Sequence, residues 1–488
     1  MKPSKTRLAG ASALAILCAT GAATTLAQPA SSAPPSGSYI LLTPSGNGNA
    51  KAVAAIEKSG AKVVASYDQI GVVVVKATTD QAAAVGQAGV GAIAATGTLG
   101  TKVEDSETVA DAGAGAAAAG SASAATAASP TDEPLWGLQW DMRSIGVEAA
   151  QAVTQGSKSV VVGVLDSGID GSHPDLATQV DHSRSAGCLG GVADPSYAAW
   201  QPTTSAHGTH VAGTIAAADN GIGTVGIAPG VTLAAVKVVD DDGFIYPEAA
   251  ICGFMWAADH GFSLTNNSYF IDPWEFNCRN DAGQRAIWQG VQRAIRYSES
   301  KGVLNIAAAG NDNLDLQHTL IDKVSPDNAT PVTREVTNAC VDLPAEAAGV
   351  VAVSATGPTN LKSYYSSYGQ GVVDVAAPGG DTRVRNPNVS TISDAILSTV
   401  PGGWGYMQGT SMASPHAVGV AALALSAHPG MSPGALSSFL QRTADPLPCP
   451  PGLYNPRPTL PQYQATCSGG NVNSFYGHGL VDAAAAVQ

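Results

Sequence analysis

Short apolar runs alternate with longer helical stretches from about residue 131 to residue 488. The runs are rich in Val, Ile and Leu and have the length of buried strands, whereas the stretches between them have helical composition. This alternation favours a parallel sheet with helices on both faces. We therefore predict an α/β fold of three layers around a mostly parallel central sheet. The expected strands are residues 159–165, 232–239, 262–266, 303–309 and 349–354, and the expected helices are residues 210–218, 247–260 and 282–300.

A smaller unit is expected before this region. Residues 38–101 contain two strand-like runs and two helical stretches, which predicts a small α+β unit. Residues 102–130 are rich in Ala, Gly and Ser and too poor in large apolar side chains to pack, so we expect a flexible, protease-accessible linker. A unit that precedes such a linker is typical of a removable propeptide, and a small accessory domain is the alternative.

Residues 1–27 have the features of an export signal. Lys2, Lys5 and Arg7 precede an apolar run at residues 8–17, and small residues suited to cleavage follow. No later stretch has the roughly 20 uninterrupted apolar residues that a membrane span needs. We therefore expect a secreted, extracellular protein without a membrane anchor.

Charge and cysteine content agree with that expectation. The formal net charge of -14 over 488 residues argues against nucleic acid as a partner, because phosphate binding needs a basic surface. Removal of Cys18 with the signal leaves six of the seven cysteines, an even number that indicates disulfides in an exported chain. Six cysteines allow 15 pairings. We favour the pairs Cys449–Cys467, Cys188–Cys252 and Cys278–Cys340.

Three polar residues lie at strand ends and helix starts, where active sites form in the predicted fold. Asp166 directly follows a predicted strand, at the carboxyl edge where active sites of parallel sheets form. His207 precedes a glycine near a helical stretch, and Ser411 lies at the start of a buried helix whose unpaired N–H groups favour a neighbouring oxyanion. Singly, they could be a turn residue, a structural histidine and a helix cap. Together they are the set that a hydroxyl nucleophile needs.

The segments around these residues resemble the motifs of the subtilisin-like serine proteases. VVVGVLDSGID resembles the family's aspartate motif, HGTHVAGTIAA its histidine motif and GTSMASPHAVG its serine motif, in the family's order. The resemblance implies a triad of Asp166, His207 and Ser411, and it selects His207 over His210 and Asp166 over Asp170. The residue types alone could make neither choice.

The resemblance extends over residues 136–487, within a predicted peptidase domain at residues 131–488. In the segment NIAAAGND it implies that the Asn311 side chain donates to the oxyanion, and a Gly-Asn turn is the alternative. Ser268 and Gly310 are expected to line the substrate cleft. Phe270 stands where many relatives have a small glycine, so we expect a reshaped cleft and carry over no side-chain preference.

Asp342 is a candidate for substrate selection. It precedes Leu343-Pro344, at a position that resembles the pocket for the residue before the cut. A carboxylate there would favour Lys or Arg through charge pairing. A solvated loop residue is the alternative.

The resemblance also implies a structural calcium ion and no catalytic cofactor. Asp175 and the loop at residues 218–224 match the family's calcium site in spacing and length. An Asn-Gly turn without an ion is the alternative. The hard oxygen ligands would be the Asp175 carboxylate, the Asn220 amide and the carbonyls of Ala218, Ile222 and Thr224.

Taken together, the sequence predicts a monomeric, secreted serine endopeptidase. It would act on protein or peptide substrates through an acyl-enzyme on Ser411, as a self-processing zymogen whose propeptide is inhibitor and chaperone. Two alternatives remain: a catalytically vestigial protein that binds peptides, and a transpeptidase that passes the acyl group to an amine.

Overall fold

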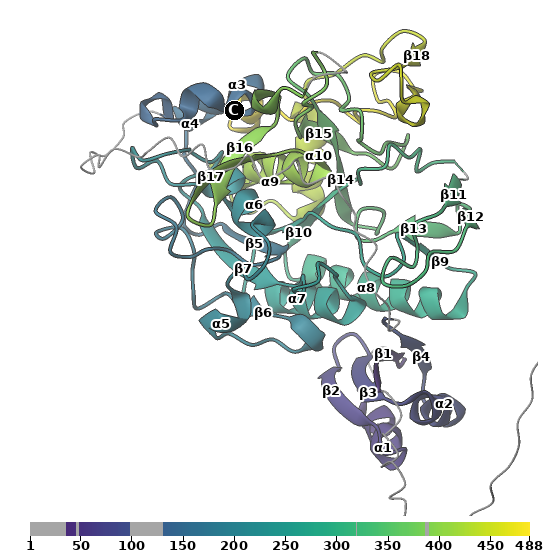
Figure 1. Ribbon diagram of the computed structural model, residues 1–488. Helices are drawn as coiled ribbons and strands as arrows, with labels where there is room; N and C mark the ends of the chain where they lie inside the picture. Colours follow the sequence, from purple (N-terminus) through teal and green to yellow (C-terminus); the bar gives the residue numbers. More distant parts are fainter. Residues whose placement is uncertain (1–35, 45–47, 98–129, 319, 386–389) are drawn as a thin grey trace, which may run out of the picture. The chain divides into compact units, whose positions relative to one another are not determined.

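The computed structural model describes residues 36–44, 48–97, 130–318, 320–385 and 390–488. The signal predicted at residues 1–27 and all but the last residue of the linker predicted at 102–130 lie outside these ranges. The central sheet has seven parallel strands in the order β15-β14-β10-β8-β5-β7-β6, which confirms the predicted α/β fold (Figure 1). Its strands are β5 (Val161–Asp166), β6 (Ala186–Gly187), β7 (Thr232–Lys237), β8 (Leu264–Asn267), β10 (Leu304–Ala308), β14 (Val350–Thr356) and β15 (Val375–Pro378).

Helices cover both faces of this sheet (Figure 1). Side chains alternate along β5: Val162 and Val164 pack in one core with α6 (His207–Ala216) and α9 (Thr410–Ala427). Val161 and Leu165 of the same strand pack in a second core with α7 (Pro247–Asp259) and α8 (Ala282–Ser300). The two cores fix the sheet between helix layers, so its carboxyl edge is a rigid support for a site.

The remaining elements are short and lie outside the central sheet. The helices among them are α3 (Trp140–Ser144), α4 (Val147–Gln151), α5 (Tyr197–Trp200), α10 (Pro433–Thr443) and α11 (Ala483–Ala486). The strands form the pairs β9 (Phe276–Cys278) with β13 (Cys340–Asp342), β11 (Leu320–Asp322) with β12 (Arg334–Val336), β16 (Ile396–Val400) with β17 (Gly403–Met407), and β18 (Leu453–Tyr454) with β19 (Ala465–Thr466).

Helix α9 is buried along most of its length and contains Pro415 in its interior. A proline there has no N–H for the carbonyl four residues earlier, which is that of Ser411. The Ser268 hydroxyl donates to this carbonyl instead, at 2.9 Å. The proline therefore leaves Ser411 with a hydrogen bond to β8's carboxyl end rather than to its own helix.

Residues 36–97 form the smaller α+β unit. Four antiparallel strands in the order β2-β3-β1-β4 carry two helices around a core of their own. The strands β2 and β4 were not among the runs predicted from the sequence. The elements are β1 (Gly37–Leu42), α1 (Ala50–Lys58), β2 (Lys62–Tyr67), β3 (Val72–Ala77), α2 (Thr79–Gln87) and β4 (Ala92–Ala95).

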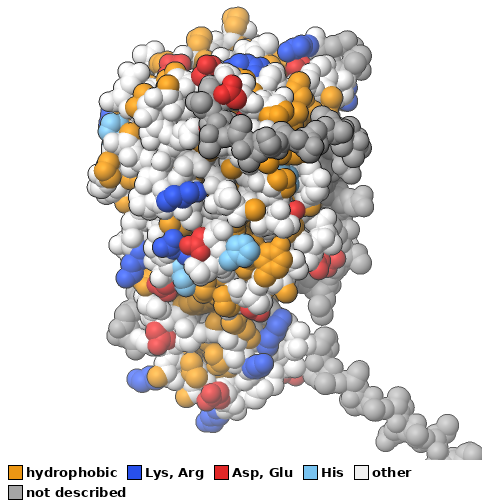
Figure 2. Space-filling view, turned by 90° about the vertical axis from the view of Figure 1, so that its left-hand side faces the viewer, with side chains coloured by type: hydrophobic (Ala, Val, Ile, Leu, Met, Phe, Trp, Pro, Cys, Tyr) orange, Lys and Arg blue, Asp and Glu red, His pale blue; other side chains and the backbone are white. Residues whose placement is uncertain are grey.

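Three disulfides join Cys188 to Cys252, Cys278 to Cys340 and Cys449 to Cys467, which confirms all three favoured pairs. On the face drawn in Figure 2, Lys and Arg side chains lie among Asp and Glu side chains. Within the described ranges, no helix has both the length and the apolar character required to cross a bilayer.

Candidate active site

Asp166 and His207 meet where strand β5 ends and helix α6 begins. The Nδ1 atom of His207 lies 2.9 Å from Oδ1 and 3.0 Å from Oδ2 of Asp166. Asp166 is almost completely buried, with 1% of its side chain exposed, whereas 28% of the His207 side chain is exposed. Gly208 permits this approach, because a Cβ atom there would lie 2.4 Å from the Gly168 carbonyl and 3.0 Å from Asp166 Oδ1.

This pairing sets the charge of the imidazole. Desolvation lowers the pKa of His207, but the charge of Asp166 and its hydrogen bond more than offset that effect, so the pKa is raised above its usual value. The carboxylate also holds Nδ1 as the protonated nitrogen, which leaves Nε2 as the basic atom.

Ser411 lies in the first turn of helix α9 and lines the same cleft as His207, a cavity of about 580 Å³. Its hydroxyl donates to the Ser268 carbonyl at 3.3 Å. In the described residues, no hydrogen bond joins this hydroxyl to His207. Catalytic hydrogen bonds are often long or absent before substrate binds.

Asn311 follows strand β10 at the rim of this cleft. Its Oδ1 atom accepts from both the backbone N–H and the hydroxyl of Thr410, each at 2.9 Å. These two bonds fix which end of the amide is the acceptor, so the Nδ2 atom is the end available as a donor. The Asn311 amide is thereby oriented next to the residue that precedes Ser411.

His210 lies three residues after His207 but is turned into the protein. Its side chain is buried, its Nε2 lies 3.1 Å from the Ile396 carbonyl, and burial is the main reason that its pKa is lowered to about 3. Asp170 accepts from Ser172 and does not contact either histidine through a hydrogen bond within the described ranges. The arrangement therefore brings together Asp166 and His207, and not His210 or Asp170.

The substrate side of the cleft contains Ser268, Gly310 and Asp342, which the sequence singled out, together with Phe270. Asp342 is only 5% exposed, so the alternative of a solvated loop residue is wrong. Asp342 is buried in β13, which pairs with β9. Both strands are too short to be predicted from the sequence.

Gln462 and Tyr463 also line the cleft, although no sequence feature predicted them there. They belong to the segment that the Cys449–Cys467 disulfide closes. Asn313 Nδ2 donates to the carbonyls of Gln462 and Gln464, at 3.0 and 3.2 Å, and so fixes this segment beside the cleft. A contact between loops about 150 residues apart has no local sequence signal.

The predicted calcium ligands lie close together. Asp175 is buried and accepts from Trp404 Nε1 at 2.8 Å, from the Thr224 N–H at 3.2 Å and from Asn220 Nδ2 at 3.4 Å. Ala218 is joined to Asp175 through their backbones, and the Asn220 Oδ1 atom accepts from the Ile222 N–H. The loop thus closes around the Asp175 carboxylate.

Glu133 adds a second carboxylate that the sequence analysis missed. It accepts from the N–H groups of Asn220, Gly221 and Gly223, and the nearby charge of Asp175 is one of the effects that raise its pKa after burial. Two buried carboxylates at one loop fit a divalent cation, because each oxygen can accept an N–H and still coordinate a metal. No cluster of three His, Cys, Asp or Glu side chains suited to a metal occurs in the described ranges.

A model of the subtilase family matches residues 157–479. Fervidolysin of Fervidobacterium pennivorans is 31% identical over 332 residues, which are 64% of this chain and 40% of that protein. Subtilisin NAT of Bacillus subtilis subsp. natto is 34% identical, over 59% of this chain and 60% of its own length. M-protease of Shouchella clausii is 31% identical, over 72% of this chain and 70% of its own length. The alignments with fervidolysin and subtilisin NAT thus span less than two thirds of those relatives.

Solved structures agree with the fold. The crystal structure of fervidolysin has a TM-score of 0.60 at 26% identity, over 93% of this chain and 61% of that one. The epidermin leader peptide processing serine protease of Staphylococcus aureus has a TM-score of 0.67 at 20% identity, over 93% of this chain and 98% of that one.

Proposed function

The chain belongs to the subtilase family, and from that premise we propose that it is a serine endopeptidase that hydrolyses peptide bonds through an acyl-enzyme on Ser411. The observation that carries the proposal is the hydrogen-bonded pair of Asp166 and His207 across one cleft from Ser411. A nucleophile, a base and a group that orients the base are the parts that acyl transfer needs.

The proposed reaction begins with a rotation of the Ser411 hydroxyl from the Ser268 carbonyl toward His207. His207 takes the proton as the oxygen attacks the substrate carbonyl, and Asp166 stabilises the imidazolium that forms. The negative oxygen then accepts hydrogen bonds from Asn311 Nδ2 and from the backbone N–H of Ser411, because the neighbouring N–H groups of Thr410 and Met412 already have acceptors. His207 returns the proton to the leaving amine, and water releases the acyl group by the same steps.

Ser268 and Gly310 serve as walls of the substrate cleft in this proposal. Ser268 has a second role, because its hydroxyl holds the Ser411 carbonyl that Pro415 leaves without an intrahelical donor. Substrate residues on either side of the scissile bond would lie along these backbone segments.

We propose that the unit predicted at residues 38–101, which the structure describes over residues 36–44 and 48–97, is a propeptide that is removed by self-processing. Ile40, Leu42 and Val72 of this unit pack in the same core as α7 and α8. Arg293 of α8 donates to the carbonyls of Thr43, Ile70 and Gly71 at 2.8 to 3.1 Å. A unit held on the two helices in this way can serve as chaperone and inhibitor until it is cleaved.

A structural calcium ion is part of the proposal. Asp175, the Asn220 amide and the carbonyls of Ala218, Ile222 and Thr224 would hold it, with Glu133 as an additional ligand. Such an ion supplies positive charge to two buried carboxylates and takes no part in the reaction. Export is proposed from the signal features at residues 1–27. We also propose a monomer, because no sequence feature indicates an oligomer.

The first test compares the secreted wild-type protein with Ser411→Ala. Wild type should hydrolyse an unstructured protein substrate and lose residues 36–97, whereas Ser411→Ala should stay at full length and lose turnover by a factor on the order of 10⁴ or more. Peptide binding without hydrolysis in the wild type would support the vestigial alternative. Ligation of an added amine in place of hydrolysis would support the transpeptidase.

A further inference from the structure

Carboxyl side chains line the substrate cleft, and the hydrolytic reaction does not use them. Five carboxyl side chains line it, whereas none of the described residues that line it is Lys or Arg. A cleft lined by one sign of charge attracts groups of the opposite sign. The carboxyl residues are Asp272, Glu275, Asp312, Asp327 and Asp342.

Asp342 differs from a surface carboxylate because it is buried and aimed at the reacting centre. Its Oδ1 atom is enclosed and has no hydrogen-bond partner in the described part of the chain. Its Oδ2 atom lies 3.9 Å from the point where a Cβ atom of Gly310 would be. Gly310 directly precedes Asn311, so the carboxylate lies next to the donor that would hold the substrate carbonyl. A buried carboxylate without a partner is costly unless a ligand supplies one.

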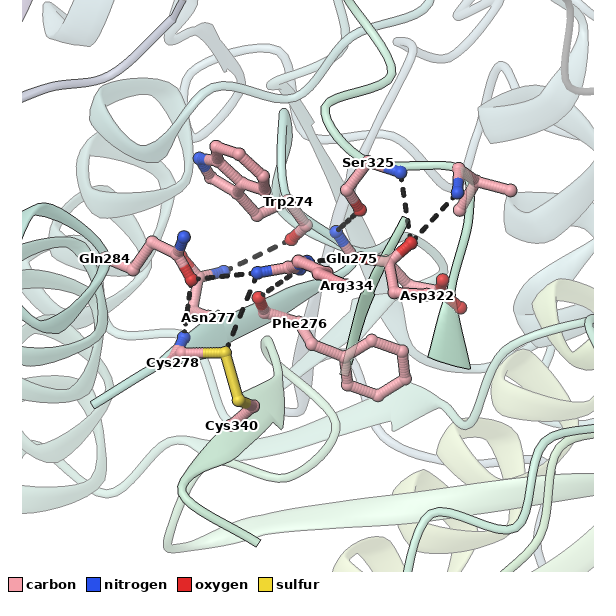
Figure 3. A network of polar contacts seen from close by, with 11 residues as sticks. Trp274, Glu275, Phe276, Asn277, Cys278, Gln284, Asp322, Ser325, Arg334 and Cys340 are labelled. Atoms are coloured by element: carbon pink, nitrogen blue, oxygen red, sulfur yellow. Dashed lines mark hydrogen bonds and ion pairs between the residues drawn. A yellow bond between two sulfur atoms is a disulfide. The ribbon is translucent and has the colours of Figure 1, made fainter. Parts of the chain in front are cut away.

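The strands that hold Asp342 are braced from several sides. In the antiparallel pair of β9 and β13, Asp342 lies opposite Phe276, and Cys278 and Cys340 are joined two residues away. Arg334 lies next to Phe276 and Cys278 (Figure 3) and donates to the Phe276 carbonyl at 2.7 Å. The carboxylate is thus held on a rigid support rather than on a mobile loop.

The two arginines of this region have other partners. Arg334 forms an ion pair with Asp322 at 2.7 Å and also donates to Gln284 Oε1 (Figure 3). Arg279 donates to the carbonyls of Asn338 and Ala339. Within the described residues, neither arginine forms an ion pair with Asp342, so its carboxyl group remains available to a ligand in the cleft.

We infer that Asp342 determines specificity: it lies at the floor of the pocket for the substrate residue before the scissile bond, and it pairs there with a guanidinium or ammonium side chain. The carbonyl that Asn311 would hold belongs to that same residue, so its side chain enters the pocket beside Gly310. This inference rests on the proposed function and names its substrate class. The pairing replaces a buried, unpartnered oxygen by a charge-assisted hydrogen bond.

The empty pocket favours a protonated carboxyl. Burial raises the pKa of Asp342 well above its usual range, and the carboxylates of Glu346 and Asp312 raise it further. A bound cation lowers the pKa of Asp342 instead. The carboxyl group therefore releases its proton to solvent as the basic side chain enters. A neutral side chain of the same shape offers no such exchange.

The test uses the processed enzyme and fluorogenic peptides that differ only in the residue before the scissile bond. Arginine is compared with citrulline, in which a neutral urea replaces the guanidinium, and lysine with acetyl-lysine. We expect kcat/KM for arginine to exceed that for citrulline by roughly 10- to 100-fold, the range for a hydrogen bond to a charged group. Asp342→Asn, which keeps the shape and removes the charge, should bring this ratio close to one.

Glu335→Gln is the matched control, because Glu335 is an exposed residue of β12 and lies outside the cleft lining. It should leave the arginine-to-citrulline ratio as in the wild type. A wild-type ratio near one would overturn the inference without any variant, and so would an unchanged ratio in Asp342→Asn. Either result can occur while Ser411-dependent hydrolysis persists, which separates this inference from the proposed function.

Discussion

The catalytic edge and the wall of the substrate pocket are built in different ways. Asp166, His207 and Ser411 lie at strand ends and helix starts of the central sheet, and each belongs to a continuous sequence motif. The pocket wall consists of β9 and β13, two strands of three residues outside that sheet, which a disulfide and Arg334 hold in register. The catalytic chemistry therefore depends on the core layers, whereas substrate selectivity depends on contacts between segments that are distant in the sequence.

The largest effect should come from the catalytic edge. Asn311→Leu removes the amide donor, and we expect kcat to fall by about 10²- to 10³-fold, the loss known for the equivalent donor of subtilisin. The arginine and citrulline peptides should lose the same factor, because the oxyanion is common to both. Steady-state kinetics with the two peptides measures this, and circular dichroism checks folding. Unchanged turnover would remove Asn311 from the site.

A smaller and more selective effect should come from the pocket wall. Arg334→Met removes the brace behind β9, and we expect the arginine-to-citrulline ratio to fall on the order of threefold to tenfold, about 0.7 to 1.4 kcal/mol. The unpaired Asp322 should also lower the melting temperature, because loss of one partner leaves a buried charge.

The double variant Arg334→Met/Asp322→Asn is the matched control for that charge. Its melting temperature should be higher than that of Arg334→Met, whereas its arginine-to-citrulline ratio should stay as low. If Arg334→Met leaves the ratio unchanged, Arg334 does not position Asp342, and selectivity does not depend on this long-range contact.

Calcium removal should have the smallest effect on either region's chemistry. We expect a chelator to lower the melting temperature by several degrees near pH 7.5 and to leave the substrate ratio unchanged. Burial raises the pKa of Asp175 to about 6, so the metal-free protein binds more protons folded than unfolded between about pH 4 and pH 6. Its stability therefore falls as the pH rises through that window, and the benefit of calcium should grow over the same window.

Calorimetry with and without chelator at about pH 4.5 and 7.5 measures this difference. Asp175→Asn should abolish the response to calcium, while its amide oxygen can still accept from Trp404. A melting temperature that chelator does not change at either pH would refute the calcium proposal.

The two regions also differ in how far the sequence predicted them. The runs that became β5, β7, β8, β10 and β14 were predicted because each lies in a short stretch that contains Val, Ile or Leu and is bounded by helical segments or turns. By contrast, β6 has two residues, and β4 and β15 are rich in Ala, so neither length nor composition marked them. All three disulfides were predicted as pairs.

The site residues likewise divide into those that the sequence predicted and those that it did not. Asp166 and His207 were predicted from motifs, and the strand end and helix start bring them into contact. Glu133, Gln462 and Arg334 were missed, because each acts through partners that are distant in sequence. The burial of Asp342 could not be predicted for the same reason, since it follows from the pairing with β9.

Covalent labelling of the processed enzyme with a fluorophosphonate shows whether Ser411 is the nucleophile that His207 activates. We expect one label per molecule, located on Ser411 by peptide mapping, absent in Ser411→Ala and formed far more slowly in His207→Ala. A folded, processed enzyme that hydrolyses peptides without reacting at Ser411, or that reacts equally fast without His207, would contradict it.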